Sequence, residues 1–145
     1  MGFQYSLATV LRVRGIVEEQ EERMLQKILF EITQTLEAIA RIDADLAELD
    51  ASRSANLFKP SLGRNLHASY GEVAQLKQNK KDLAEKLQKL EQLRERQLMV
   101  YREARRNREM LTDMREEQLG VYESDMARRE QKTLDDNFIA RRGRV

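Results

Sequence analysis

Residues 50–71 read DASRSANLFKPSLGRNLHASYG, and this stretch decides how the chain must fold. It holds the only proline, Pro60, together with Gly63, Gly71 and four serines. A proline removes a helical hydrogen bond, and a glycine inside a helix costs about 1 kcal/mol relative to alanine. The flanking sequence has no proline and is rich in helix-forming residues. We therefore predict helices at about residues 3–51 and 66–140, separated by a break at about 52–65.

The composition is typical of long helices and coiled coils. Of 145 residues, 35% are charged and only 6% are aromatic, with no tryptophan and no cysteine. The lack of cysteine excludes disulfides and thiolate metal sites and fits a reducing compartment. No apolar run approaches the ~18 residues of a membrane span, and residues 1–11 lack the pattern of a signal peptide. We expect a soluble, cytoplasmic helical protein.

Each predicted helix carries an apolar seam. In the first, residues three and four apart give the a and d positions of a coiled coil: Leu25, Ile28, Ile32, Thr35, Ile39, Ile42, Leu46 and Leu49. Upstream, we expect Val10, Val13 and Val17 to continue this seam only after a shift near Met24. The second seam weakens at Arg94 and Gln97 between two apolar stretches: Val73, Leu76, Leu83, Leu87 and Leu90, then Tyr101, Ala104, Leu111 and Met114.

The charges predict that the two helices pair with each other. Residues 18–50 hold ten acidic and three basic residues, whereas residues 77–108 hold eleven basic and five acidic ones. A turn near residues 57–60 makes the numbers of paired residues sum to about 115–120, so the acidic block faces the basic block. We predict an all-α fold: a single domain over residues 1–145, formed by a long antiparallel two-helix coiled coil that is monomeric when free.

The same register leaves part of the second helix without a partner. It pairs Phe3 with about residue 115, so residues 116–145 form a C-terminal overhang. Its apolar residues lack an internal partner: Val121, Tyr122, Met126, Leu134, Phe138 and Ile139. Such a segment is either frayed or docked on another protein, and we favour docking.

No motif in the sequence indicates catalysis. The glycines are scattered, without a phosphate-binding loop, and one histidine with no cysteine gives no triad or zinc site. We predict no enzyme activity, no cofactor and no metal. The arginines at 102, 105, 106 and 108 could bind nucleic acid, but a solvated face or pairing with the acidic helix explains them better. His67 fits a polar position at a helix start better than a partner contact.

The two ends of the sequence carry a recognisable pattern. Residues 3–14 read FQYSLATVLRVR, which is aromatic-x-aromatic-x-Leu followed by x-x-Val-Leu-x-x-Arg. Residues 129–136 read REQKTLDD, and Phe138 and a basic tail follow. Both ends resemble the FliJ family, whose closing signature is Glu or Gln, Lys, an apolar residue and Asp-Glu. Asp136 stands where many relatives have glutamate.

The resemblance implies a component of the flagellar type III protein export apparatus, acting in flagellum biogenesis and motility. It implies a coiled coil similar to the gamma-subunit stalk of rotary ATPases, in the cytoplasm and peripheral at the inner-membrane face of the flagellar basal body. The implied partners are the hexameric export ATPase, whose ring assembly and activity the family promotes, the export-gate protein FlhA, and export chaperones. No nucleic acid is implied.

By analogy with the gamma stalk, the end that holds both termini faces the ATPase. The residues expected there are Leu7, Val10, Leu11, Met126, Glu130, Lys132, Leu134, Asp135 and Phe138. The opposite end would face FlhA, with Ile42, Leu46, Leu49, Tyr70 and Val73 as candidates. Seam packing explains Ile42, Leu46 and Leu49 at least as well. The alternatives are the equivalent stalk of a virulence-type type III secretion system and a generic coiled-coil scaffold.

Overall fold

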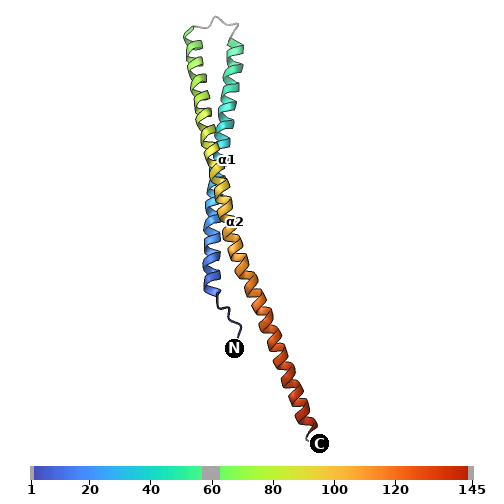
Figure 1. Cartoon of the computed structure of the whole chain (residues 1–145). Helices are drawn as coiled ribbons and strands as arrows, with labels where there is room; N and C mark the ends of the chain where they lie inside the picture. Colours follow the sequence, from blue (N-terminus) through green and yellow to red (C-terminus); the bar gives the residue numbers. More distant parts are fainter. Residues whose placement is uncertain (1, 57–62, 144–145) are drawn as a thin grey trace. The chain divides into compact units, whose positions relative to one another are not determined.

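The structure is a computed structural model that describes residues 2–56 and 63–143, with residues 56 and 63–69 described by their backbone alone. The described residues form two helices and no strand: α1 spans Ala8–Asn56 and α2 spans Gly63–Arg142 (Figure 1). The helices pack against each other as a helical hairpin. The predicted all-α fold is therefore confirmed.

The helix ends differ from the predicted ones. Helix α1 begins five residues later than expected, at Ala8, whose N–H donates to the carbonyl of Tyr5 at 3.1 Å. It continues to Asn56. Pro60 lacks the N–H that would donate the next helical hydrogen bond to the carbonyl of Asn56. Helix α2 begins at Gly63 and ends at Arg142, slightly beyond the expected 66–140. The rest of the predicted break, residues 57–62, lies outside the described residues.

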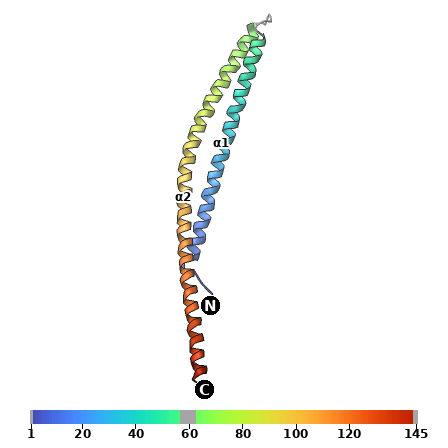
Figure 2. The same ribbon diagram turned by 90° about the vertical axis from the view of Figure 1, so that its right-hand side faces the viewer.

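Contacts divide the chain into two compact units, each with a piece of both helices. The terminal unit combines Met1–Gln20 with Tyr101–Val145, and the middle unit is Glu21–Val100. In the middle unit, α1 and α2 lie side by side in both views of Figures 1 and 2. In the terminal unit, the first turns of α1 lie beside the segment of α2 that starts at Tyr101 (Figure 2).

The seam of the middle unit is the predicted one. All eight predicted seam residues of α1, from Leu25 to Leu49, are buried or half-buried, while most of their neighbours are exposed. Ile32 and Thr35 are buried on α1, as is Leu90 on α2. Thr35 satisfies its hydroxyl inside its own helix by donating to the carbonyl of Glu31 at 2.8 Å. The a/d pattern therefore identified the buried face correctly.

The predicted upstream seam holds only in part. Val17 is half-buried, but Val10 and Val13 are exposed, and the a and d positions that are half-buried are Leu11, Glu18 and Glu21. These three lie at heptad positions that continue directly from Leu25. Two of them are glutamates, so the hydrophobic pattern alone could not follow the seam through this segment.

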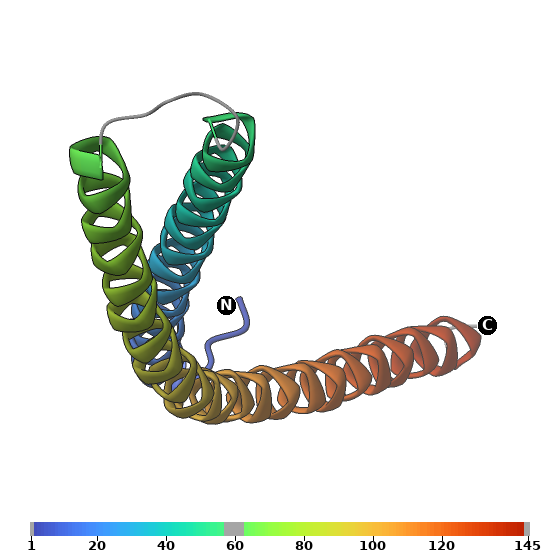
Figure 3. The same ribbon diagram turned by 90° about the horizontal axis from the view of Figure 1, so that it is seen from above.

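The C-terminal part of α2 extends beyond its contacts with the N-terminal segment. The rings of Phe3 and Tyr122 lie with centroids 5.5 Å apart, so the pairing reaches Tyr122 and not about residue 115 as predicted. A non-helical residue advances the chain by up to ~3.3 Å, against 1.5 Å in a helix, so the segment before Ala8 reaches further than a helix would. Beyond Tyr122, every described residue from 123 to 143 is exposed. No other helix lies beside the C-terminal end of α2 in Figure 3. We call residues 123–143 the overhang.

Candidate partner-binding surfaces

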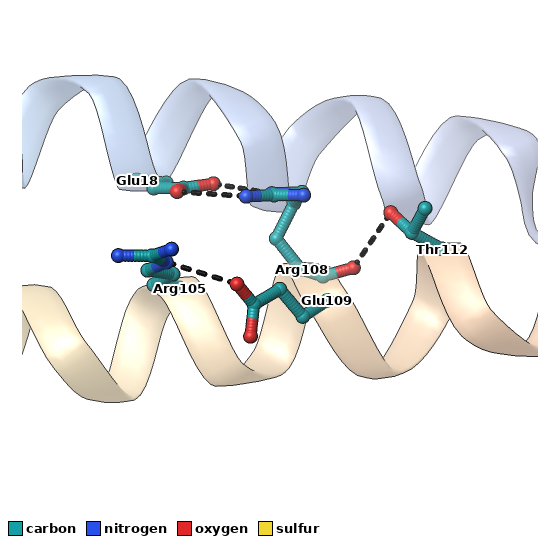
Figure 4. A network of polar contacts seen from close by, with 5 residues as sticks. All are labelled: Glu18, Arg105, Arg108, Glu109 and Thr112. Atoms are coloured by element: carbon teal, nitrogen blue, oxygen red, sulfur yellow. Dashed lines mark hydrogen bonds and ion pairs between the residues drawn. The ribbon is translucent and has the colours of Figure 1, made fainter.

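A charged pair occupies the seam of the terminal unit. Arg108 donates from Nε to Oε2 of Glu18 at 2.6 Å and from Nη2 to Oε1 at 3.1 Å (Figure 4). The side chains are 14% exposed for Glu18 and 32% for Arg108. Two parallel hydrogen bonds between guanidinium and carboxylate form the strongest geometry for such a pair. The pair thus fills a seam position of each helix with opposite charges.

This pairing changes the acidity of both groups. The hydrogen bond from Arg108 lowers the pKa of Glu18, although partial burial opposes the shift. The same bond raises the pKa of Arg108. Nearby on α2, Arg105 donates from Nε to Glu109 at 2.9 Å (Figure 4). Arg108 thus pairs with the acidic helix α1, as expected for the basic run, whereas Arg105 pairs with a carboxylate of its own helix.

Polar side chains also bridge the helices of the middle unit. Gln97 donates from Nε2 to the backbone carbonyl of Glu21 at 3.0 Å and also to its carboxylate. Lys80 forms an ion pair with Asp43 at 2.7 Å. The weak region of the predicted seam at Gln97 is therefore a polar layer with a partner on the other helix.

The polar contacts of the middle unit give partner numbers at or slightly above the predicted register. The numbers sum to 118 for Glu21 and Gln97, but to 123 for Asp43 and Lys80. Helical side chains lean toward the N-terminus of their own helix, so in an antiparallel pair two long side chains meet although their backbones are offset. The offset is about one helical turn and is consistent with a backbone register close to the predicted one.

Two aromatic residues fix the N-terminal segment to α2. Tyr5 is buried, and its hydroxyl donates to the backbone carbonyl of Leu111 at 3.1 Å. Phe3 packs on Tyr122 with a ring angle of 49°. We call this segment, residues 2–7, the N-terminal strap. It covers the part of α2 that lies just before the overhang.

The residues expected to bind the ATPase fall into two groups. The N-terminal group flanks the strap: Leu7 and Leu11 are half-buried, and Val10 is exposed. The C-terminal group lies in the overhang and is exposed throughout: Met126, Glu130, Lys132, Leu134, Asp135 and Phe138. Three of the latter, Met126, Glu130 and Leu134, line a shallow groove with Arg129 and Thr133. The strap contacts reach Tyr122, just before the overhang that holds the C-terminal group.

The residues expected to bind FlhA belong to the middle unit and differ in accessibility. Ile42, Leu46, Leu49 and Val73 are half-buried at seam positions. Tyr70 is 57% exposed, and the guanidinium of Arg53 lies 4.1 Å from the centroid of its ring. Of the five candidates, Tyr70 therefore offers the accessible surface. His67 has no described side chain.

The described residues carry open grooves and no cluster suited to a metal ion. Among them, no group of three or more His, Cys, Asp or Glu is placed to hold a metal ion. No helix in that part of the chain is long and apolar enough to cross a bilayer. The grooves that line the helices are shallow and open, such as the one formed by Arg23, Lys27 and Phe30 on α1.

A family model described as "Flagellar FliJ protein" matches residues 3–144, nearly the whole chain. The chain belongs to the FliJ family. No curated protein and no solved structure matches it. Membership in the FliJ family makes the chain a component of the flagellar type III export apparatus.

The structure gives the two FliJ-like end motifs different environments. The opening motif supplies the strap, since Phe3 and Tyr5 are its aromatic residues. The closing motif, residues 129–136, lies in the overhang and is fully exposed. Sequence reasoning missed the contacts of Glu18 and Gln97, because a polar side chain at a seam position signals pairing only once its partner is known.

Proposed function

We propose that this FliJ-family protein is the central stalk of the flagellar export ATPase. In this proposal the terminal unit enters the ATPase ring, promotes its assembly and raises its rate of ATP hydrolysis. The protein supplies no nucleotide ligand and acts by binding some ring conformations more tightly than others. The middle unit would contact the export gate FlhA, and the protein would escort export chaperones at the cytoplasmic face of the basal body.

One observation carries the ATPase contact: the overhang exposes large apolar side chains that have no seam to fill. Leu134, Phe138 and Ile139 are each about two-thirds exposed. Exposed apolar side chains of this size on a terminal helix are typical of a surface that becomes buried on assembly. The groove beside Leu134 adds a concave feature with charged edges, Arg129 and Glu130.

The contact with FlhA has narrower support. Tyr70 is the accessible member of its candidate set, and aromatic residues with a polar tip are enriched in protein interfaces. Its ring is held by the guanidinium of Arg53, which limits the side-chain entropy lost on binding.

The direct test is ATP hydrolysis by the export ATPase of the same organism, measured with and without this protein while hexamer formation is followed. We expect both to rise. A variant with Leu134→Ala and Phe138→Ala should lose most of this effect. Phe30→Ala is the matched control, because Phe30 and Phe138 are both 64% exposed and Phe30 lies in the middle unit.

The controls separate the stalk from a generic scaffold. If Phe30→Ala reduces stimulation as much as the overhang variant does, the effect is not specific to the overhang. If the wild-type protein leaves hydrolysis and hexamer content unchanged at tens of micromolar, the stalk proposal is wrong. Light scattering should give one chain per particle, whereas a dimer would favour the scaffold.

A further inference from the structure

The two flanks of the terminal unit differ sharply in chemistry. Leu11 and Glu18 occupy a positions on α1, and Arg108 and Leu111 occupy a and d positions on α2. In an antiparallel coiled coil, the g and c positions of both helices lie on one side of the seam, and the e and b positions lie on the other. The heptad position of a residue therefore tells on which side of the seam it lies.

The g and c side carries apolar side chains from both helices, next to Asn107 and two glutamates of α2. Its apolar members are Val10, Val13 and Val17 from α1 and Met110 and Met114 from α2, which together we call the valine–methionine face. Val17 is half-buried, but Val13 is 50% exposed and Met110 is 59% exposed, so most of the face is accessible in the free chain. Next to it on α2, Met114 and Val121 line a shallow groove with Glu117.

The e and b side is polar, which makes the apolar side distinctive. It carries the ion pair between Arg105 and Glu109 and the hydroxyl of Thr112, which donates to the carbonyl of Arg108 (Figure 4). The hairpin in this unit therefore resembles a bundle from which one helix is missing on a single side. Two helices that present adjoining apolar flanks form the groove that an amphipathic helix fills.

The charges at the rim select the occupant. Glu103 and Glu117 are exposed c positions on α2, each seven residues from Met110. A second copy of this chain, docked on the face antiparallel about Met110, would place Glu103 of one copy against Glu117 of the other. A parallel arrangement would place each glutamate against its own equivalent. Both arrangements bring like charges together, which is unfavourable.

We propose that the valine–methionine face binds one amphipathic helix of a partner protein, with its apolar stripe flanked by lysine or arginine. The stripe lies on the valines and methionines, and the basic flanks pair with Glu103 and Glu117. Methionine suits this role, because its flexible thioether adapts to different apolar surfaces. The face extends over eight residues of α1, and a helix of about four turns also spans the distance from Glu103 to Glu117, which lie 14 positions apart. This inference is independent of the stalk proposal.

The test uses two designed helical peptides labelled with fluorescein. Both carry the same stripe of leucines on one face, flanked by lysine in one peptide and by glutamate in the other. Fluorescence anisotropy with the full chain should show tighter binding of the lysine-flanked peptide. Val13→Ser with Met110→Ser should raise its Kd about tenfold, through lost apolar burial. Both residues lie outside the seam, and far-UV circular dichroism checks that the variant folds.

The matched control is Phe30→Ser with Met99→Ser, which removes two exposed apolar side chains from the middle unit and should leave the Kd within about twofold. Glu103→Gln with Glu117→Gln should weaken the lysine-flanked peptide several-fold and reduce its advantage over the glutamate-flanked one. The proposal is overturned if the Val13 and Met110 variant binds as well as wild type. It is equally overturned if neither peptide binds, or if sedimentation shows a dimer that this variant abolishes.

Discussion

The pair of Glu18 and Arg108 gives the sharpest test of how charges stabilise the pairing of α1 with α2. Exposed ion pairs contribute about 0.2–1 kcal/mol, whereas removing one partner of a fully buried pair costs about 3–5 kcal/mol. At 14% and 32% exposure, with two hydrogen bonds, this pair lies between these limits. We expect Arg108→Met to lower the free energy of unfolding by about 2 kcal/mol and Glu18→Gln by about 1 kcal/mol.

The assay is a double-mutant cycle by urea unfolding, followed by circular dichroism at pH 7. The expected coupling energy between the two sites is about 1 kcal/mol. Arg105→Met and Glu109→Gln form the matched control cycle, because that pair lies within α2 and both side chains are about half exposed. Its coupling should be clearly smaller, because solvent screens an exposed pair. A Glu18–Arg108 coupling no larger than the control would refute the seam pairing.

The same cycle has a pH dependence whose sign is fixed by Glu18. Its pKa is lowered in the folded chain by the hydrogen bond from Arg108, so the folded state favours the carboxylate. The stability from this shift is present above the unfolded-state pKa and is lost as the pH falls through the lower folded-state pKa. The coupling should therefore shrink on acidification from pH 7 to about pH 3. A coupling that stays constant over this range would contradict the assignment.

Three further predictions test other parts of the molecule. Tyr5→Phe should lower the free energy of unfolding by about 1 kcal/mol in urea titrations, because the carbonyl of Leu111 loses its donor; an unchanged value would show that the strap is not ordered by this bond. Deleting residues 125–145 should leave helicity per residue and thermal unfolding nearly unchanged while abolishing ATPase binding, and a large loss of stability would mean that the overhang packs within the chain. Tyr70→Ala should weaken binding to FlhA in calorimetry without lowering the melting temperature by more than about 2 °C, and equal affinity would remove Tyr70 from that interface.

The seam of the middle unit could be predicted from sequence because its energetics are local to each side chain. Residues such as Ile32 and Leu90 bury apolar surface whatever lies opposite, so spacing alone reveals them. Glu18 and Gln97 are different, since a polar side chain at a seam position is favourable only with the right group across from it. Their pairing depends on the register between the two helices. A short stretch of sequence does not reveal this register, because the paired residues lie far apart in the chain.

The candidate binding residues divide in the same way. Exposure of Leu134 and Phe138 could be foreseen, because the register left them without a partner. The position of Val10 could not, since three valines at near-helical spacing look like a seam until the true seam is known to pass through Glu18. The predicted start of α1 is too early for a similar reason. Tyr5 contacts Leu111 of α2, which lies 106 residues away in sequence.

The lack of a deep core has a consequence for how the paired helices unfold. Among the described residues, no side chain is less than 2% exposed, because two paired helices have a seam but no interior. Within each unit, a layer then touches only the layers before and after it, so stability accumulates layer by layer along the seam. Amide hydrogen exchange should be fastest at the ends of the paired segments and slowest near the layer of Ile32, Thr35 and Leu90. A partner that binds near the strap can therefore separate the first layers of the terminal unit and bind their side chains, while the remaining layers of that unit stay paired.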